Sequence, residues 1–438
     1  MRVPSAASFY LPYMSFAGWL LVAAVVVEFL LFTFLRNAFG PFVSPVVLWL
    51  AGVGAGVSGI WAFWGQPLPV LRSFNWRQML GLLLPVAVLV LFASRVARLL
   101  QRVPIDPAQS DVIPSIQVFV RRWLASEPVY VPIHDFGYLL YPTYLPLTWL
   151  PFVPAELLNF DYRWVAFGGF GVGIMAGASL LLRRRLPLPV TLGLLAVPLL
   201  LLQGLLQTNP GTLTNTVELL IVGYYLLLAY SVWRGPWWAQ ALALTCCLLS
   251  RFSLVFWVPL WLALLWQQAG RVAALRVAAL TAFLVLVVYV GPFLSHDWGA
   301  FARAQLTYTN AAIAEWEQLT FGLPEHLYRG VGLAVFFHRF APGSVAEQVQ
   351  LIRVVHVGVC LAVVVAGTAY WFLRRPALDY RIYALLTLKV YLVTFYAFVQ
   401  VPYIYLTLVG VALAWPLLLL LPTRSGGAAA GVASLTDS

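Results

Sequence analysis

The chain has 438 residues, of which 62% are hydrophobic and 9% are charged, and its net charge is +11. Soluble proteins carry about 25% charged residues, so this composition excludes a soluble protein and indicates a polytopic membrane protein. The positive charge does not indicate nucleic-acid binding, because the arginines lie mostly in short segments between apolar runs, where they orient membrane spans. Cys246, Cys247 and Cys360 lie in apolar segments without the spacing of a disulfide framework or a metal site, so no metal or other cofactor is expected.

The hydrophobic runs predict an all-α protein with about twelve transmembrane helices, since a span needs about 20 mostly apolar residues. No internal repeat is evident. The spans are expected at residues 12–35, 41–64, 79–98, 163–182, 188–206, 212–232, 237–250, 252–267, 272–294, 350–373, 381–399 and 402–421.

The spans and the polar segments between them divide the chain. We expect two N-terminal spans in 1–78, a transmembrane core in 79–294 with a first outer loop in 99–162, an outer loop in 295–349, C-terminal spans in 350–421, and a disordered Gly-, Ala- and Ser-rich tail in 422–438. No chemistry is assigned to the loop 295–349.

Arginine clusters between the spans predict the orientation, because short cytoplasmic loops are rich in basic residues. With twelve spans and both ends inside, the clusters at Arg72/Arg77, Arg183/Arg184/Arg185, Arg271/Arg276 and Arg374/Arg375/Arg381 all face the cytoplasm. The same count places the loops 99–162 and 295–349 outside, together with Arg251 and the turns at 207–211 and 400–402. Arg95, Arg98 and Arg102 are an exception near the outer end of the third span, where they could contact anionic headgroups or a phosphate.

A polar stretch at residues 105–154 separates apolar sequence on both sides, and charge near a membrane is a candidate for a functional site. Within it, apolar residues recur at helical spacing and arginines occupy the rest of the helix surface. The apolar positions are Ile116, Phe119, Val120, Trp123 and Leu124. This pattern predicts an amphipathic helix in the membrane interface on the outer face.

The proline-rich segment 142–154 follows that helix. Pro142, Pro146, Pro151 and Pro154 interrupt helical hydrogen bonding, and the segment is too short to cross the membrane. We expect it to dip into the bilayer beside the polar stretch.

Asp111 stands at the start of the amphipathic helix, where two interpretations apply. An aspartate at that place can cap the helix, or it can supply a carboxylate to a site. Asp106 is the local competitor, but it precedes Pro107 and is expected to begin a turn.

Other polar residues are expected in the same outer layer. Arg251 lies between two short apolar runs, where its guanidinium could bind a phosphate or lie at a helix end near the membrane surface. Gln207 and Asn209 could bind hydroxyl-rich ligands or cap the following helix.

Three charged residues fall inside predicted spans. Glu28 and Glu218 are interpreted as structural, each paired with a neighbouring helix. Lys389, the only lysine of the chain, could face a cavity or pair with Glu218.

The order of these motifs resembles a known family. Asp111, a helix, Pro128-Val129-Tyr130 and then Tyr141-Pro142 are similar to the first outer loop of the polyprenyl-phosphate-mannose-dependent mannosyltransferases, glycosyltransferase family 87 of the GT-C superfamily. Gln207-Thr208-Asn209 and Ser250-Arg251-Phe252 resemble later motifs of that family. The chain departs from the pattern at Ser126-Glu127 and Thr143, and Arg251 stands where a lysine is common. The resemblance covers about residues 79–290.

The resemblance implies an integral membrane enzyme, in the plasma membrane of a bacterium with its active site outside the cytoplasm. It would transfer a sugar, with mannose favoured, from a polyprenyl-phosphate donor to a glycan, lipid or other hydroxyl acceptor, with inversion and without a cofactor. Asp111 would be the general base. The residues implied in substrate binding are Arg102, Asp106, Tyr130, Tyr141, Gln207, Asn209 and Arg251.

Two other classes of function fit the composition. A transporter or lipid flippase also needs many spans and buried charge, although inverted repeats with broken helices, typical of many transporters, are not evident. A non-catalytic assembly protein of the cell envelope would not depend on Asp111.

Overall fold

The structure is a computed structural model that describes residues 14–137, 139–319, 322–375 and 377–422. Over these ranges the regular structure is helical, apart from one isolated antiparallel bridge between Ile133 and Leu140. The predicted all-α fold class is therefore confirmed for the described residues. The predicted disordered tail lies outside them, except for its first residue.

Helices occupy all the segments predicted as spans. Their bounds are α1 Phe16–Thr33, α2 Gly40–Ala62, α3 Trp76–Gly81 with α4 Leu83–Arg102, α8 Arg163–Leu182, α9 Leu188–Thr208, α11 Glu218–Arg234, α12 Trp237–Leu248, α13 Trp257–Gln268, α14 Arg271–Val285 with the π-helical turn η3 Leu286–Val290, α17 Val345–Arg374, α18 Tyr380–Ala397, α19 Ile404–Ala412 and α20 Ala414–Leu420.

Shorter helices lie between the spans. They are α5 Val112–Leu124, α6 Pro146–Trp149, η1 Leu150–Phe152, α7 Val153–Leu157, α10 Gly211–Thr214, η2 Phe252–Leu254, η4 Leu294–His296, α15 Ala300–Glu317, η5 Glu325–Tyr328 and α16 Ala334–Phe340.

Seven helices in the described ranges are long and apolar enough to cross a membrane: α1, α2, α3–α4, α8, α9, α14–η3 and α17. The other five predicted spans are α11, α12, α13, α18 and α19–α20, which fall short of that length or, in α18, of that apolar character. A polytopic membrane protein is thus supported, and the count of twelve spans stays a prediction.

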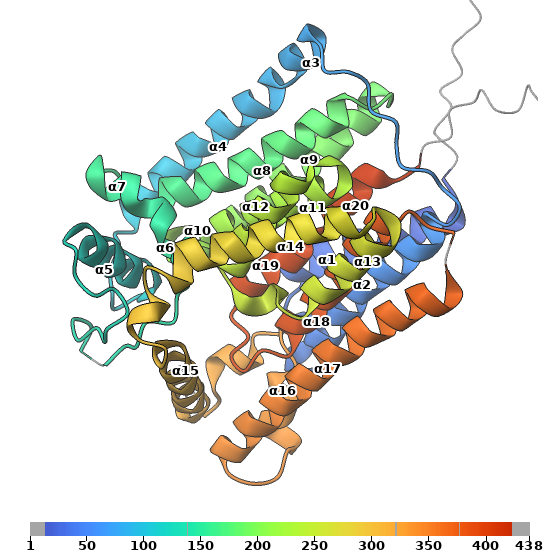
Figure 1. The fold of residues 1–438 in the computed structure, drawn as a ribbon. Coiled ribbons are helices and arrows are strands. Elements are labelled where there is room, and N and C mark those ends of the chain that lie inside the picture. Colours follow the sequence, from blue (N-terminus) through green and yellow to red (C-terminus); the bar gives the residue numbers. More distant parts are fainter. Residues whose placement is uncertain (1–13, 138, 320–321, 376, 423–438) are drawn as a thin grey trace, which may run out of the picture.

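The loops gather at two opposite ends of the helix bundle, in the grouping that the sequence predicted. At one end, which we call the arginine end, the backbone NH of Arg72 donates to the carbonyl of Arg183 at 3.0 Å and that of Gly65 donates to Ala377. At the other, which we call the loop end, Leu147 NH donates to Leu249 O at 2.9 Å and Trp316 Nε1 to Gln400 O at 2.9 Å. Figure 1 shows α5, α7 and α15 together at the loop end. Which end faces the cytoplasm stays a prediction.

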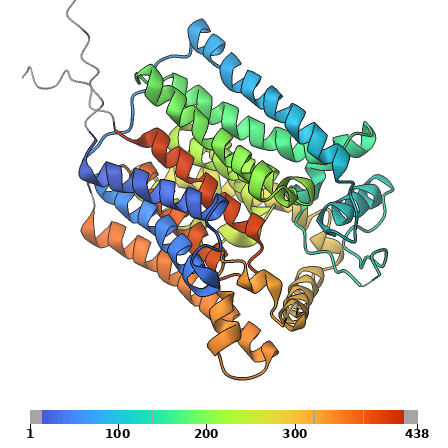
Figure 2. The same ribbon diagram turned by 180° about the vertical axis from the view of Figure 1, so that it is seen from behind.

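Glycines let two pairs of helices approach closely. Along α8, Gly169, Gly173 and Gly177 recur every fourth residue and face α11, where Gly223 meets the backbone of Gly169. Along α2, Gly52, Gly56 and Gly59 face α18 in the same way. Such stripes of small residues allow van der Waals packing between membrane helices. Figure 2 shows α1 and α2, in blue, along the C-terminal helices in red and orange.

The prediction that Lys389 could pair with Glu218 is wrong. Lys389 Nζ donates to both carboxylate oxygens of Glu28 and to the carbonyl of Gly410, all at 2.6 Å. Lys389 and Glu28 are both buried. The structural pairing expected for Glu28 is therefore confirmed, with α18 as the neighbouring helix.

The predicted amphipathic helix is present as α5, but protein covers most of its apolar face. Ile116, Phe119 and Val120 are fully buried, and the Phe119 ring meets the Trp149 ring edge to face. Trp123 and Leu124 each remain 41% exposed. Only this C-terminal end of the helix is therefore open to lipid headgroups.

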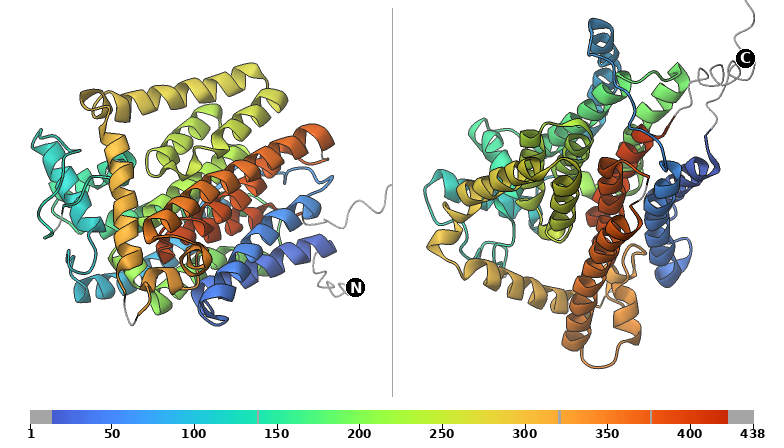
Figure 3. Two further views of the ribbon diagram at one scale, coloured as in Figure 1. Left: turned by 90° about the horizontal axis from the view of Figure 1, so that it is seen from below. Right: turned by 45° about the vertical axis from the view of Figure 1, so that its right-hand side comes forward.

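The proline-rich segment forms α6, η1 and α7, and it begins and ends at the loop end. It packs against α11 and the segment that follows α12, since Tyr224 Oη donates to Leu147 O at 3.3 Å and Thr148 Oγ1 to Ser250 O at 2.7 Å. Helix α15 lies across the bundle at this same end, nearly perpendicular to the long helices (Figure 3, left). Together these segments cover the loop end.

Candidate functional site

A buried ion pair lies at the loop end. Glu218 is the first residue of α11 and is fully buried, whereas Arg251 has extended backbone in the break between α12 and η2. A terminal nitrogen of Arg251 donates to Glu218 Oε2, and the arginine side chain keeps 25% of its surface exposed. Arg251 is therefore held from within the bundle and still reaches its surface. The structural partner expected for Glu218 is confirmed as Arg251.

Tyrosines from four other segments surround the guanidinium. The Tyr405 ring centroid is 6.0 Å from the Arg251 guanidinium carbon. Tyr144, Tyr308 and Tyr396 lie within electrostatic reach of the same group. Tyr308 belongs to α15, and burial raises the pKa of its hydroxyl. We call these four tyrosines, Glu218 and Arg251 the Arg251 cluster.

Asp111 lies within electrostatic reach of Tyr405, as Arg251 does. Asp111 occupies the N-cap position of α5, but its side chain makes no capping hydrogen bond there. Two serines fix this end of α5: Ser115 Oγ donates to Asp111 O at 2.6 Å and Ser110 Oγ to Asn215 O at 3.0 Å. The Asp111 side chain therefore does not cap α5 through a hydrogen bond, and its role as a site carboxylate stays a prediction.

In the described part of the chain, no side-chain contact joins Asp106 or Arg102 to the Arg251 cluster. Asp106 Oδ1 accepts from the backbone NH of Ala108 at 2.9 Å, which is the turn that its place before Pro107 predicted. Arg102 is exposed in the last turn of α4.

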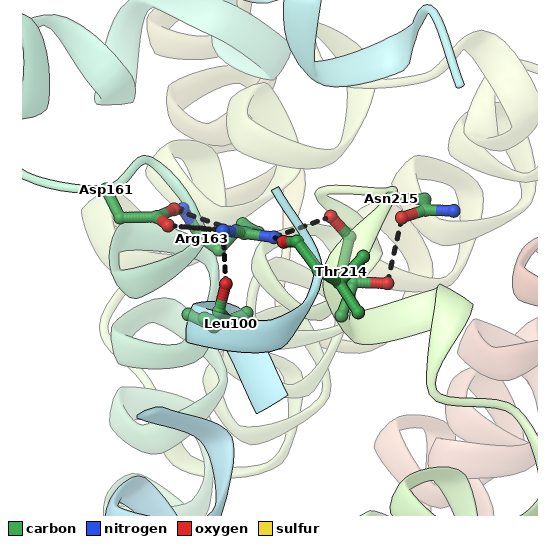
Figure 4. A network of polar contacts seen from close by, with 6 residues as sticks. Leu100, Asp161, Arg163, Thr214 and Asn215 are labelled. Carbon is green, nitrogen blue, oxygen red and sulfur yellow. Dashed lines mark hydrogen bonds and ion pairs between the residues drawn. The ribbon is translucent and has the colours of Figure 1, made fainter. Parts of the chain in front are cut away.

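A second arginine, Arg163, fixes the surroundings and was not predicted. It is 4% exposed and forms an ion pair with Asp161 at 2.6 Å. Its guanidinium also donates to the carbonyl oxygens of Leu100 (3.3 Å), Val103 (2.7 Å) and Thr214 (3.4 Å) (Figure 4). The network therefore ties the end of α4 and the start of α8 to α10. The sequence signal is Asp161-x-Arg163 at a helix start, a spacing that also occurs at Asp379-x-Arg381.

Asn209 and Gln207 do not converge on the cluster. Asn209 Nδ2 donates to Thr212 Oγ1 at 2.8 Å, and Asn209 O accepts from Thr212 NH, so the local capping interpretation fits its contacts. Gln207 is exposed in the last turn of α9. Asn215 accepts from Thr214 Oγ1 at 2.8 Å and extends the Arg163 network (Figure 4).

Tyr130 and Tyr141 line a cavity of about 100 Å³ between the loop 99–162 and α15. The opposite wall carries the exposed ion pair of Asp297 and Arg303. The Tyr130 hydroxyl donates to Tyr144 O at 3.1 Å and accepts from Trp149 Nε1 at 3.2 Å. Burial raises the pKa of Tyr130, so its phenol stays protonated. Tyr130 therefore acts in packing as well as lining the cavity.

Two polar atoms of the ion pair lack protein partners. Among the residues that the structure describes, Glu218 Oε1 and Arg251 Nε are buried without a hydrogen bond to protein. Buried polar groups are normally satisfied, so a ligand or a water molecule is expected there. No group of three or more His, Cys, Asp or Glu side chains within the described ranges could hold a metal ion.

The site combines a carboxylate, a set of phenols and a paired guanidinium on elements that are far apart in the sequence. No family model, curated protein or solved structure matches the chain. The chemistry of the site and the sequence motifs therefore carry the argument for function.

Proposed function

We propose that this protein is an integral membrane glycosyltransferase. It transfers a sugar, mannose being favoured by the sequence motifs, from a polyprenyl phosphate to a hydroxyl group of a glycan, lipid or other acceptor outside the cytoplasm. The observation that supports this most is that Arg251, paired with the buried Glu218, keeps part of its surface exposed and lies, like Asp111, within electrostatic reach of Tyr405. Asp111 supplies a base and Arg251 a cation, which are the two groups that transfer from a phosphate requires.

In the proposed reaction, the Asp111 carboxylate takes the proton of the acceptor hydroxyl. The acceptor oxygen attacks the anomeric carbon from the face opposite the phosphate, and a new carbon–oxygen bond forms. The bond between the anomeric carbon and the phosphate oxygen breaks, and the electron pair leaves with the polyprenyl phosphate. The configuration at the anomeric carbon is inverted, and the proton remains on Asp111.

Arg251 would stabilise the negative charge that grows on the departing phosphate. A guanidinium suits this role because its planar donors match phosphate oxygens. Glu218 fixes Arg251 from the buried side, so little reorganisation is needed when the charge develops. The tyrosines around Arg251 supply hydroxyl groups that can orient a sugar.

The proposal is tested by replacing Asp111 and Asp106 in turn. The full chain is purified in detergent and assayed for transfer from a panel of polyprenyl-phosphate sugars to hydroxyl acceptors. Asp111→Asn keeps the size of the side chain and removes its basicity, so turnover should fall by about 10²–10⁴-fold while the melting temperature stays unchanged.

Asp106→Asn is the matched control. It lies in the same loop and makes a local turn contact, which an amide oxygen can also make. Its turnover should stay close to that of the wild type. Normal turnover in Asp111→Asn would remove Asp111 from the mechanism, and a selective loss in Asp106→Asn would move the role of base to that residue.

A further inference from the structure

A second pocket lies at the arginine end, far from the Arg251 cluster. Its volume is about 340 Å³, and Val70, Leu71, Arg183 and Arg234 line it. Pockets of small ligands begin at about 300 Å³, so this one is large enough for a headgroup. The proposed glycosyltransferase reaction makes no use of it.

The pocket is built by Arg183, which follows the last residue of α8, and by Arg234, the last residue of α11, and both hold one connecting segment. Arg183 Nε donates to Arg72 O at 2.8 Å, and Arg72 NH donates back to Arg183 O at 3.0 Å. A terminal nitrogen of Arg234 donates to Pro69 O at 2.6 Å. Both guanidiniums are thus fixed at the wall, and each uses only one nitrogen for a protein acceptor in the described part of the chain.

The charges around the pocket are unbalanced. Arg234 lies within electrostatic reach of Arg183, Arg381 and Asp379. Asp379 is already bound to Arg381, with 3.0 Å between a terminal nitrogen and Oδ2. Since one carboxylate faces three guanidiniums here, an anion in the pocket would offset the repulsion between them.

The apolar part of the lining points to the kind of anion. Val70 is 86% exposed, and Leu71 stands beside it in the wall. A lipid offers both a phosphate for the arginines and an acyl chain for this apolar rim. The connecting segment between α2 and α3 runs along the outside of the bundle (Figure 2).

We propose that Arg183 and Arg234 form a binding site for the phosphate headgroup of an anionic phospholipid. Basic pockets between transmembrane helices recognise such headgroups. Free inorganic phosphate could bind the same arginines, but it has no acyl chain. An experiment can therefore distinguish binding of a phospholipid from binding of free phosphate.

The test measures thermal stabilisation of the full chain in an uncharged detergent. A ligand that binds only the folded state raises the melting temperature. Dioleoyl phosphatidylglycerol is titrated against dioleoyl phosphatidylcholine, and millimolar inorganic phosphate is added in a separate series. Phosphatidylglycerol should stabilise the wild type, while phosphatidylcholine and inorganic phosphate should not.

Arg183→Gln with Arg234→Gln removes both cations of the pocket. The phosphatidylglycerol concentration for half-maximal stabilisation should rise at least about tenfold, because two charge-assisted contacts are lost. The matched control, Arg271→Gln with Arg276→Gln, removes two charges that lie over Trp266 and Trp237 and do not line the pocket. The control should keep the wild-type concentration within about twofold.

Val70→Trp covers the case in which the double arginine variant does not fold. It keeps both arginines, fills the mouth of the pocket, and should raise the half-maximal concentration in the same direction. Equal values in the wild type, the double arginine variant and Val70→Trp would overturn the site. Stabilisation by inorganic phosphate equal to that by phosphatidylglycerol would overturn the assignment to a lipid.

Discussion

Arg251 is held by a carboxylate that has no access to water. Glu218 is fully buried, and its second oxygen has no partner in the described part of the protein. Breaking a buried ion pair from one side is costly, because the remaining charge is left without compensation. Stability and activity are therefore expected to be linked at Arg251, and a single substitution cannot separate them.

A pair of variants separates the two roles. Arg251→Ala should lower the unfolding free energy by about 3–5 kcal/mol and abolish transfer, because it strands the Glu218 carboxylate. Arg251→Ala combined with Glu218→Gln should recover most of the stability and none of the transfer. Melting temperature and turnover, measured on both variants and on Arg251→Lys, check this. Transfer restored in the double variant would show that Arg251 is only a structural partner.

The second buried pair, Glu28 and Lys389, is expected to be structural alone. Lys389→Met should destabilise the protein by several kcal/mol, since it leaves Glu28 buried without its cation. Adding Glu28→Gln should restore much of the loss, and transfer per folded molecule should stay at the wild-type rate in the double variant. A specific loss of transfer there would contradict the structural role.

The sequence could not choose the partner of Lys389. It shows two carboxylates in apolar segments, and both α1 and α11 lie near the C-terminal helices. The choice between the two carboxylates depends on how far along the helix axes each side chain lies relative to Lys389. The hydrophobic pattern does not contain this information. The same limit applies to Arg163, because its three carbonyl acceptors are backbone atoms of distant segments.

At the scale of the helices, close packing of α8 and α11 depends on glycine. A Cβ atom at Gly223 would lie 2.3 Å from the backbone oxygen of Gly169. Backbone cannot move aside as a flexible side chain can, so the two helices would have to separate.

Gly223→Ala should therefore destabilise the protein by about 1–3 kcal/mol, which is the usual cost of overpacking. Gly168→Ala is the control in the same helix pair, since no described atom lies within 4 Å of its added Cβ. That control should be neutral or slightly stabilising, because alanine favours a helix. The two variants are compared by their melting temperatures in detergent. Equal destabilisation by both would contradict the close contact between Gly223 and Gly169.

Much of the element structure could be predicted from local pattern. The twelve apolar segments are helical, α5 has the predicted apolar face, and prolines divide 142–154 into short pieces. What covers α5 could not be predicted. Phe119 packs against Tyr144 and Trp149, which come from a segment whose own pattern is irregular.

At the scale of the whole molecule, the arginine clusters predicted which loops share an end. The hydrogen bonds between Arg72 and Arg183, and between Arg184 and Leu421, agree with that grouping. Within the candidate site, Asp111 and Arg251 both lie within electrostatic reach of Tyr405, whereas no contact in the described part of the chain joins Arg102, Gln207 or Asn209 to them. Sidedness limits a residue to one layer, but it does not fix its position within that layer.

Labelling of single cysteines checks the orientation in intact cells. In a background with Cys246, Cys247 and Cys360 replaced, cysteines at Ala125 and Ser295 should react with an impermeant maleimide. A cysteine at Leu186 should react only after the membrane is opened. Labelling of the cysteine at Leu186 from outside would show that the orientation is the reverse of the predicted one, with the Arg251 cluster on the cytoplasmic side.

The shortness of α12 and α13 has a consequence for how deep the reaction lies. Each has 12 residues, or about 18 Å of helix, against about 30 Å of hydrocarbon. If their arginine ends lie at one boundary of the membrane, their other ends, beside the connection that holds Arg251, lie below the opposite boundary. A lipid-linked phosphate could then reach the guanidinium while remaining largely submerged, and a hydrophilic acceptor would have to descend to meet it. Bilayer thickness, set by acyl-chain length, would thereby become a control on turnover.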